Sequence, residues 1–171
     1  MKDLTITIDH ATHKVKKGLT VLEAAQSVGI HIPSLCYMKL HDIDIENKPG
    51  GCRICVVEVK GRKNLVPSCC TEVEEGMEIQ THSMRVINAR RTVMELILSN
   101  HPAECLTCAK AGDCELQVTA DRLGIRELHY EGEKTQVRRG NSPAISRDPN
   151  KCILCRRCEM MCNDVQTVGC L

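Results

Sequence analysis

The sequence predicts an α+β fold assembled from small segments. Residues 4–9 alternate apolar and polar side chains, as a half-buried strand does, and residues 21–28 repeat apolar side chains at helical spacing. The chain has 13 cysteines in 171 residues, no Trp or Phe, and only two Tyr. Because few large aromatic side chains are available to anchor a core, we expect small domains that bound metal helps to stabilise.

The first domain is predicted over residues 1–80. The opening strand is followed by a hairpin partner at residues 13–17. Thr20 and Glu23 form a capping-box pattern that begins a helix, and Gly29 ends it. Further short strands are expected at residues 54–59, 65–67 and 77–81.

Helices dominate the region predicted over residues 81–125. Ser83 is a good N-cap for a helix that ends before His101-Pro102, and a second helix is expected at residues 115–123. The first of these helices has an apolar face made of Val86, Ala89, Val93, Leu96 and Ile97. A linker is predicted over residues 126–145, because the chain there is polar, contains Gly and Pro, and shows no period.

Composition and charge exclude several classes of protein. A net charge of +1 gives no reason to expect nucleic acid or an anionic membrane surface as a partner. The sequence has no signal-peptide stretch and no transmembrane run, so we expect a cytoplasmic protein without membrane insertion. An odd number of cysteines that recur at two-residue gaps favours metal ligation over a secreted disulfide framework.

The first candidate ligand group is Cys36, Cys52, Cys55 and Cys69. A 2Fe-2S cluster needs four thiolates, and here a C-x-x-C pair supplies two while distant loops supply the others. The Pro49-Gly-Gly51 stretch lets the backbone approach a cluster, and its amides can hydrogen-bond the sulfurs. A structural zinc site is the alternative, but the hairpin and helix that precede the first cysteine favour the cluster.

The second candidate group is His101, Cys105, Cys108 and Cys114. Three cysteines are one ligand short of the set for a 4Fe-4S cubane, and the imidazole can supply the fourth. Because histidine contributes no charge where a thiolate contributes a negative one, we expect it to alter the reduction potential. A zinc ion on the same four side chains, and a histidine that only ends a helix, are the alternatives.

The third candidate group is Cys152, Cys155, Cys158 and Cys162. Its spacing is that of bacterial ferredoxins, with Asn163 where Pro is usual. In two-cluster ferredoxins the first three cysteines bind one 4Fe-4S cluster and the fourth binds the other. Cys162 therefore belongs either to a second 4Fe-4S cluster or, as fourth ligand, to the same one.

Two cysteines, Cys70 and Cys170, belong to none of these groups. Adjacent side chains rarely point at one site, so Cys69 is the expected ligand and Cys70 is expected to be a small buried side chain. The segment at residues 146–171 cannot complete two cubanes alone. We therefore expect the chain to be the N-terminal part of a longer protein. The alternatives are that a partner supplies the missing ligand and that Cys162 closes a single cubane.

Basic residues form two pairs, Arg90-Arg91 and Arg156-Arg157. We expect both pairs to lie on solvated faces of the protein. A second interpretation is that the two pairs offset the negative charge of nearby clusters or bind an acidic partner.

The order of the three groups resembles a known arrangement. With His101-Pro-Ala-Glu-Cys-Leu-Thr-Cys-Ala-Lys-Ala-Gly-Asp-Cys-Glu-Leu-Gln117 in the middle, it resembles the N-terminal relay of three enzymes. These are iron-only (FeFe) hydrogenases, the large iron–sulfur subunit of complex I, and certain NAD-linked formate dehydrogenases. Residues 85–96, 150–163 and 165–169 look most like the multimeric NAD(P)-linked hydrogenases.

The resemblance implies a β-grasp, ferredoxin-like domain with a 2Fe-2S cluster over residues 1–80. It implies next a helical 4Fe-4S segment over residues 81–125, whose cluster has one histidine and three cysteine ligands. The start of a 4Fe-4S ferredoxin domain is implied over residues 146–171. The first two of these clusters would use the first and second candidate groups, and Cys152, Cys155 and Cys158 would bind a third cluster whose fourth ligand lies outside the chain.

The function implied by the resemblance is intramolecular electron transfer from an NAD(P)H-oxidising flavin subunit to a hydrogenase H-cluster, in an anaerobic oxidoreductase. Implied partners are a flavin- and NAD(P)-binding iron–sulfur subunit, a small thioredoxin-like 2Fe-2S subunit and, where the enzyme is electron-bifurcating, ferredoxin. No catalytic centre is expected within residues 1–171, because the H-cluster motifs and any molybdopterin domain are absent from them. The alternatives are a relay in complex I or formate dehydrogenase and, from another class, a structural zinc-binding interaction module.

Overall fold

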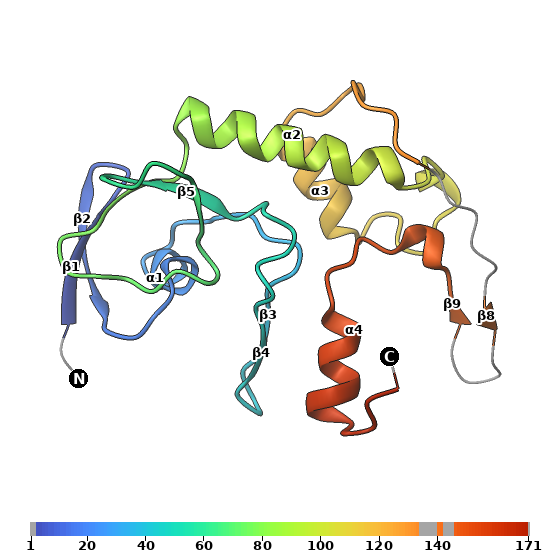
Figure 1. The fold of residues 1–171 in the computed structure, drawn as a ribbon, viewed down its shortest axis with the longest axis horizontal. Coiled ribbons are helices and arrows are strands. Elements are labelled where there is room, and N and C mark those ends of the chain that lie inside the picture. The colour runs from blue at the N-terminus through green and yellow to red at the C-terminus, as the bar shows by residue number, and fades with distance from the viewer. Residues whose placement is uncertain (1–2, 134–139, 142–145, 171) are drawn as a thin grey trace. The chain divides into compact units, whose positions relative to one another are not determined.

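A computed structural model describes residues 3–133, 140–141 and 146–170 (Figure 1). The chain divides into two compact units, of which the first comprises Met1–Arg90 and Cys155–Leu171 and the second comprises Arg91–Leu154. Helix α2 (Met84–Asn100) belongs to both units. Within the described ranges, no helix is long and apolar enough to cross a membrane.

A five-stranded sheet with the strand order β2-β1-β7-β5-β6 forms the centre of the first unit. Strands β1 (Asp3–Ile8) and β2 (Ala11–Lys16) form an antiparallel hairpin, and β1 pairs in parallel with β7 (Glu78–Gln80). Strand β5 (Val56–Val59) is antiparallel both to β7 and to β6 (Val66–Pro67). The five strands expected from the sequence are therefore confirmed, within one or two residues at their ends.

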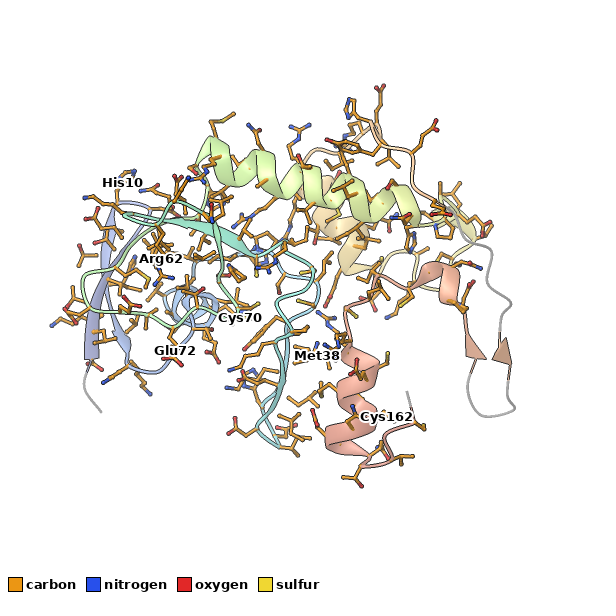
Figure 2. All side chains as sticks on the ribbon, viewed as in Figure 1. His10, Met38, Arg62, Cys70, Glu72 and Cys162 are labelled. Carbon is orange, nitrogen blue, oxygen red and sulfur yellow. The ribbon has the colours of Figure 1, made fainter. Side chains whose placement is uncertain are left out.

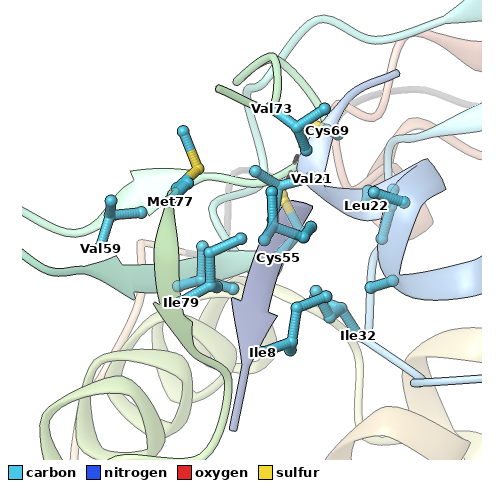
Figure 3. Packing of buried hydrophobic residues seen from close by; sticks show 14 of the residues in the cluster. Ile8, Val21, Leu22, Ile32, Cys55, Val59, Cys69, Val73, Met77 and Ile79 are labelled. Atoms are coloured by element: carbon cyan, nitrogen blue, oxygen red, sulfur yellow. Dashed lines mark hydrogen bonds between the residues drawn. The ribbon is translucent and has the colours of Figure 1, made fainter. Parts of the chain in front are cut away.

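Helix α1 (Val21–Ser27) begins with the capping box that the sequence predicts. Thr20 Oγ1 accepts a hydrogen bond from the Glu23 amide at 3.3 Å, and the Glu23 carboxylate accepts one from the Thr20 amide at 2.9 Å. The buried face of α1 packs into the same apolar core as the sheet (Figure 3). That core includes Ile6, Ile8, Val21, Leu22, Val57 and Ile79, and also Cys55 and Cys69. Two predicted metal ligands are thus part of the main hydrophobic core.

A second, two-stranded sheet lies in the first unit and was not expected from the sequence. It pairs β3 (Met38–Leu40) with β4 (Ile45–Asn47) in antiparallel fashion. Strand β4 contacts helix α4 (Arg157–Met160), which continues into a π-helical turn at Met161–Val165. The C-terminal segment of the chain therefore packs on the hairpin that follows Cys36.

Asn47 joins these two segments through its side chain. The buried Asn47 amide donates hydrogen bonds to the Cys36 carbonyl at 2.6 Å and to the Cys155 carbonyl at 3.0 Å. Nearby, Arg157 Nη2 donates to the Tyr37 carbonyl at 2.9 Å. Because Cys36 and Cys155 come from different candidate ligand groups, Asn47 physically links the loops of the first and third groups.

Short helices and loops make up the second unit, after the end of α2. A 3-10 turn spans Cys105–Thr107, and helix α3 (Glu115–Arg122) follows it. Another 3-10 turn spans Pro149–Lys151. The expected helices are confirmed, but Leu96 on the predicted apolar face of α2 is 46% exposed, so that part of the prediction was wrong.

The region expected to be a linker over residues 126–145 also contains regular structure. Strand β8 (Gly140–Asn141) lies within it and pairs with β9 (Ser146–Arg147) just beyond it. The pairing is only two residues long on each strand, too short to leave an alternating pattern in the sequence. Residues 134–139 and 142–145 lie outside the described residues.

Gly50 is predicted to tolerate no side chain. Its φ is +62°, and a Cβ there would lie 2.9 Å from Cys70 Sγ. We expect Gly50→Ala to lower the free energy of unfolding by about 1–2 kcal/mol from backbone strain alone. Gly51→Ala is the matched control, since a Cβ at that position would have no heavy atom within 4 Å. Chemical denaturation of both variants checks this, and equal stability would contradict it.

Asn47→Ala is predicted to loosen the C-terminal segment locally. The substitution removes both hydrogen bonds and leaves a buried and a part-buried backbone carbonyl without this partner, at a cost of about 1–3 kcal/mol. Hydrogen exchange should therefore become faster in residues 155–165 of the full chain. Asn64→Ala, in an exposed loop, is the control and should leave exchange unchanged. Unaltered protection of the amides in residues 155–165 of Asn47→Ala would show that the Asn47 hydrogen bonds do not stabilise the C-terminal segment.

Candidate metal centres

The four cysteines of the first group come together in the core of the first unit. Cys55 Sγ lies 3.5 Å from Cys69 Sγ. The Cys36 thiol is hydrogen-bonded to the thiols of Cys52 and Cys69. The contacts thus form two pairs, Cys36 with Cys52 and Cys55 with Cys69, and the Cys36–Cys69 contact joins the pairs. Residues separated by up to 33 positions in the chain meet at one place.

Backbone amides also point at these sulfurs. The Gly51 and Cys52 amides donate hydrogen bonds to the sulfur of Cys36, as the glycine-rich stretch led us to expect. Arg53, inside the C-x-x-C turn, has a φ of 58°, in the left-handed region. A left-handed residue reverses the local direction of the chain and turns successive amides toward one side. Such hydrogen bonds stabilise thiolates over thiols.

The thiols of this group share their protons unequally. Hydrogen bonds from Cys52 and Cys69 lower the pKa of Cys36 to about 2, and a hydrogen bond from Cys69 lowers the pKa of Cys55 to about 6. Hydrogen bonding to Cys36 raises the pKa of both Cys52 and Cys69. Each contacting pair therefore holds one easily ionised thiol and one that keeps its proton. Ionising all four requires a cation among them, which is the chemistry of a thiolate-bound metal.

Cys70 lies outside this set and is exposed, so the expectation of a buried side chain was wrong (Figure 2). Its Sγ lies 3.2 Å from the Lys48 carbonyl oxygen and 3.5 Å from Cys69 Sγ. The chain has left strand β6 at this point, and only one of the two adjacent cysteine side chains enters the core. Cys69 is the one that enters it.

The four side chains of the second group line a single cavity of about 240 Å³ in the second unit. His101 follows helix α2, Cys105 begins a 3-10 turn, and Cys114 is the N-cap residue of α3. Apolar side chains complete the wall, among them Leu98, Leu116, Ile125 and Leu128. A hollow surrounded by one imidazole, three thiols and apolar walls suits a metal cluster that must be shielded from water.

The hydrogen bond of His101 fixes which ring nitrogen can bind a metal. Nδ1 lies 3.0 Å from the Pro102 carbonyl oxygen, which can only accept, so Nδ1 carries the proton. The lone pair of Nε2 is then available as a ligand. Metal-binding histidines almost always donate their other nitrogen in this way.

The third group is divided between the two units. Cys152 belongs to the second unit, whereas Cys155, Cys158 and Cys162 belong to the first. Around Cys155, Leu154 and Arg156 have φ values of 55° and 61°, so both neighbours are left-handed. The same backbone device is present at Arg53 in the first group. It is costly for residues with side chains and is typical of functional loops.

Cys162 is buried in the π-helical turn after α4 (Figure 2). Its sulfur accepts a hydrogen bond from the Cys170 amide at 3.2 Å and lies 3.6 Å from Cys170 Sγ. Cys170, which the sequence left unassigned, is thus brought to a candidate ligand.

Across residues 3–133, 140–141 and 146–170, no three His, Cys, Asp or Glu side chains converge with the geometry of a single metal ion. In the first group the cysteine sulfurs contact one another. In the second group the four side chains line a cavity and do not meet at one position. A cluster presents several irons to its ligands, so its thiolates need not converge on one centre.

One arginine of each pair differs from the solvated faces that we expected, whereas Arg91 and Arg156 are exposed. Arg90 is buried, with its guanidinium on the Val56 carbonyl, and Arg157 is half-buried against Tyr37. The contacts of Asn47 and the burial of Arg90 were not predicted. For Arg90 a signal was present, since it lies four residues from both Val86 and Met94 on the buried stripe of α2. For Asn47 the sequence offers none.

Family comparisons agree with the two ligand groups. Residues 1–84 match the family of 2Fe-2S iron-sulfur cluster binding domains. Residues 90–129 match the NADH-ubiquinone oxidoreductase-G iron-sulfur binding region. The first match contains the Cys36 group and the second contains the His101 group. The expected 2Fe-2S and 4Fe-4S cofactors and the α+β fold are confirmed at this level.

Several curated proteins are similar over nearly the whole chain. NADP-reducing hydrogenase subunit HndD of Solidesulfovibrio fructosivorans is 56% identical over 100% of this chain and 29% of that protein. NADPH-Fe(3+) oxidoreductase subunit alpha of Geobacter sulfurreducens is 37% identical over 98% of this chain and 19% of that protein. The mitochondrial NADH-ubiquinone oxidoreductase 78 kDa subunit of Candida albicans is 32% identical over 96% of this chain and 23% of that protein. The chain therefore spans less than a third of each.

A solved structure gives the same result. A chain of an NAD+-reducing NiFe-hydrogenase, crystallised in the H2-reduced state, superimposes with a TM-score of 0.85 at 33% identity. The match covers 96% of this chain and 68% of that one. The chain thus belongs to the family of iron–sulfur proteins that includes the NAD(P)-linked hydrogenase subunits and the large iron–sulfur subunit of complex I.

Proposed function

We propose that this chain is a one-electron relay of iron–sulfur clusters within an NAD(P)-linked hydrogenase. The observation that carries the proposal is the gathering of predicted ligands: four thiols linked by three sulfur contacts, and one histidine with three cysteines around one cavity. The 56% identity to an NADP-reducing hydrogenase subunit supports the hydrogenase setting. Iron–sulfur clusters supply one-electron transfer when bound, while the chain supplies ligands, shielding and charge.

In the first group, Cys36 and Cys52 are proposed to bind one iron of the 2Fe-2S cluster, and Cys55 and Cys69 the other. Two thiolates on one tetrahedral metal, with bonds of ~2.3 Å, lie ~3.8 Å apart. The observed Cys55–Cys69 separation of 3.5 Å is close to that value. The Cys36–Cys69 contact places the two pairs side by side.

In the second group, Cys105, Cys108, Cys114 and His101 Nε2 are proposed to hold a 4Fe-4S cluster. The Pro102 carbonyl accepts a hydrogen bond from Nδ1 and so favours the tautomer whose Nε2 can bind iron. One neutral ligand leaves the site with one negative charge fewer than four thiolates would give. The chain thereby favours the reduced state at this position.

In the third group, Cys152, Cys155 and Cys158 are proposed to bind another 4Fe-4S cluster. Cys162 belongs to the same cluster or to a further one, as the sequence leaves open. Asn47 supports a relay, because its side chain joins the backbone of a first-group cysteine to that of a third-group cysteine. The domain limits proposed with these sites are residues 1–80, 81–125 and 146–171, with a linker at 126–145.

The whole enzyme and its partners belong to the same proposal. Electrons would pass between a flavin- and NAD(P)-binding subunit and an FeFe-hydrogenase H-cluster, with a small thioredoxin-like 2Fe-2S subunit and ferredoxin as further partners. Thirteen free cysteines require a reducing compartment, so we place the protein in the cytoplasm. A relay in complex I is the second candidate, favoured by the 78 kDa relative. Hydrogen-dependent reduction of NAD(P) by the purified complex would decide for hydrogenase.

Anaerobic reconstitution of the chain tests the proposal directly. We expect bound iron and acid-labile sulfide, with two-iron and four-iron signals in EPR spectra. Cys55→Ser should remove the two-iron signal and spare the four-iron signal of the second group. Cys114→Ser should remove that four-iron signal and spare the two-iron signal. Zinc without labile sulfide would end the relay hypothesis and favour a structural zinc module.

His101→Cys is predicted to keep the four-iron cluster and lower its reduction potential. A thiolate adds one negative charge to the ligand set, which disfavours the gain of an electron. EPR-monitored redox titration measures the shift. His129→Cys, an exposed position in the same unit, is the control and should leave the potential as it was. If His101→Cys left both spectrum and potential unchanged, His101 would not be a ligand.

A further inference from the structure

Arg90 is a buried cation in the first unit. Only 2% of its surface is exposed, and its Nε and Nη2 both donate to the Val56 carbonyl, at 3.2 and 2.8 Å. Val56 directly follows Cys55, so this guanidinium sits on the backbone of a proposed ligand loop. Its two hydrogen bonds go to a neutral acceptor, which leaves the positive charge uncompensated by them.

No carboxylate of the described residues forms an ion pair with Arg90. Arg85, little more than one helical turn earlier, is exposed and does have such a partner, Glu58 at 3.5 Å. Asp9 attracts Arg90 only at longer range, and its oxygens already accept hydrogen bonds from Thr81. Taking a cation out of water without a counter-charge costs several kcal/mol, so such charges are rarely found.

The Cys55 sulfur, one residue before Val56, is the first-group charge that attracts this cation when the thiol is ionised. Burial lowers the pKa of Arg90 to about 10, and the Cys55 thiolate is the largest influence acting against that shift. With four thiolates as ligands, a 2Fe-2S site carries net negative charge. The counter-charge that the protein side chains do not provide is therefore provided by the ligated site.

We propose that Arg90 sets the reduction potential of the 2Fe-2S cluster by holding a buried positive charge beside the Cys55 loop. The inference rests on the proposed 2Fe-2S site and deepens it. Each one-electron reduction, with the electron coming from a reduced flavin or a neighbouring reduced cluster, adds one negative charge to the site. A fixed cation stabilises that added charge and raises the potential.

Arg91 makes a matched control, because it adjoins Arg90 in helix α2 but is exposed. Water and salt screen a charge at the surface far more than one in the core. Substituting either arginine by Gln removes one positive charge from the same helix. The two variants differ only in whether the lost charge was buried or exposed. A potential that responds only to Arg90 would therefore report the buried charge, and not the net charge of the chain.

The test compares Arg90→Gln, Arg90→Lys and Arg91→Gln in the reconstituted full chain. Gln removes the charge and keeps a donor for the Val56 carbonyl, whereas Lys keeps the charge. EPR-monitored titration should show one-electron reduction of the two-iron cluster about tenfold less favourable in Arg90→Gln, a potential lower by ~59 mV. Arg90→Lys should stay within about threefold of the parent, and Arg91→Gln and all four-iron potentials should not move.

Three outcomes would overturn the inference: an unchanged two-iron potential in a folded Arg90→Gln, an equal shift in Arg91→Gln, or equal shifts for Gln and Lys at position 90. A purely structural role would lower the stability of the cluster-free chain without this dependence on charge. Arg90→Met, apolar and of similar length, replaces Gln if that variant does not fold. Absence of iron and labile sulfide from the parent chain would instead refute the proposed function itself.

Discussion

The gathering of four cysteine sulfurs, three of them on buried residues, is the constraint on which the rest of the structure depends. Cys55 and Cys69 belong both to the hydrophobic core and to the ligand set. The sheet, helix α1 and the loops after it must therefore bring sulfurs together from distant parts of the chain and hold them there. Four thiolates repel one another in a medium of low polarity, so this arrangement is complete only with a cation inside it.

Charge is managed differently at the second group. There one of the four proposed ligands is an imidazole, and the cavity wall carries three basic side chains, Lys110, Arg126 and Lys151, together with the acidic Glu104 and Glu127. At the first group all four proposed ligands are thiols, and the compensating charge that we propose is the buried guanidinium of Arg90. A relay needs neighbouring sites with distinct potentials, and ligand type and buried charge are two ways in which one chain provides them.

Local patterns in the sequence predicted much of the fold and of the candidate site. The capping box at Thr20, the strand alternation before it and the spacing of the cysteines are all properties of short windows, so they survive without tertiary information. Strands β3 and β4 are too short to show a period. One hydrogen-bond partner of Asn47 is the Cys155 carbonyl, which lies more than a hundred positions away in the sequence. The burial of Arg90 and the exposure of Cys70 were mispredicted for the same reason: both depend on packing between distant segments.

The left-handed residues inside the cysteine turns limit how these loops can change. Arg53, Leu154 and Arg156 all hold φ between 55° and 61°. A β-branched side chain fits that conformation worst, and glycine fits it without strain. Positions 53, 154 and 156 should therefore accept glycine and reject valine, isoleucine and threonine, whatever the polarity of the surface around them. In a library of variants, the shape of the backbone would select the residues at these positions, and their chemistry would remain free to vary.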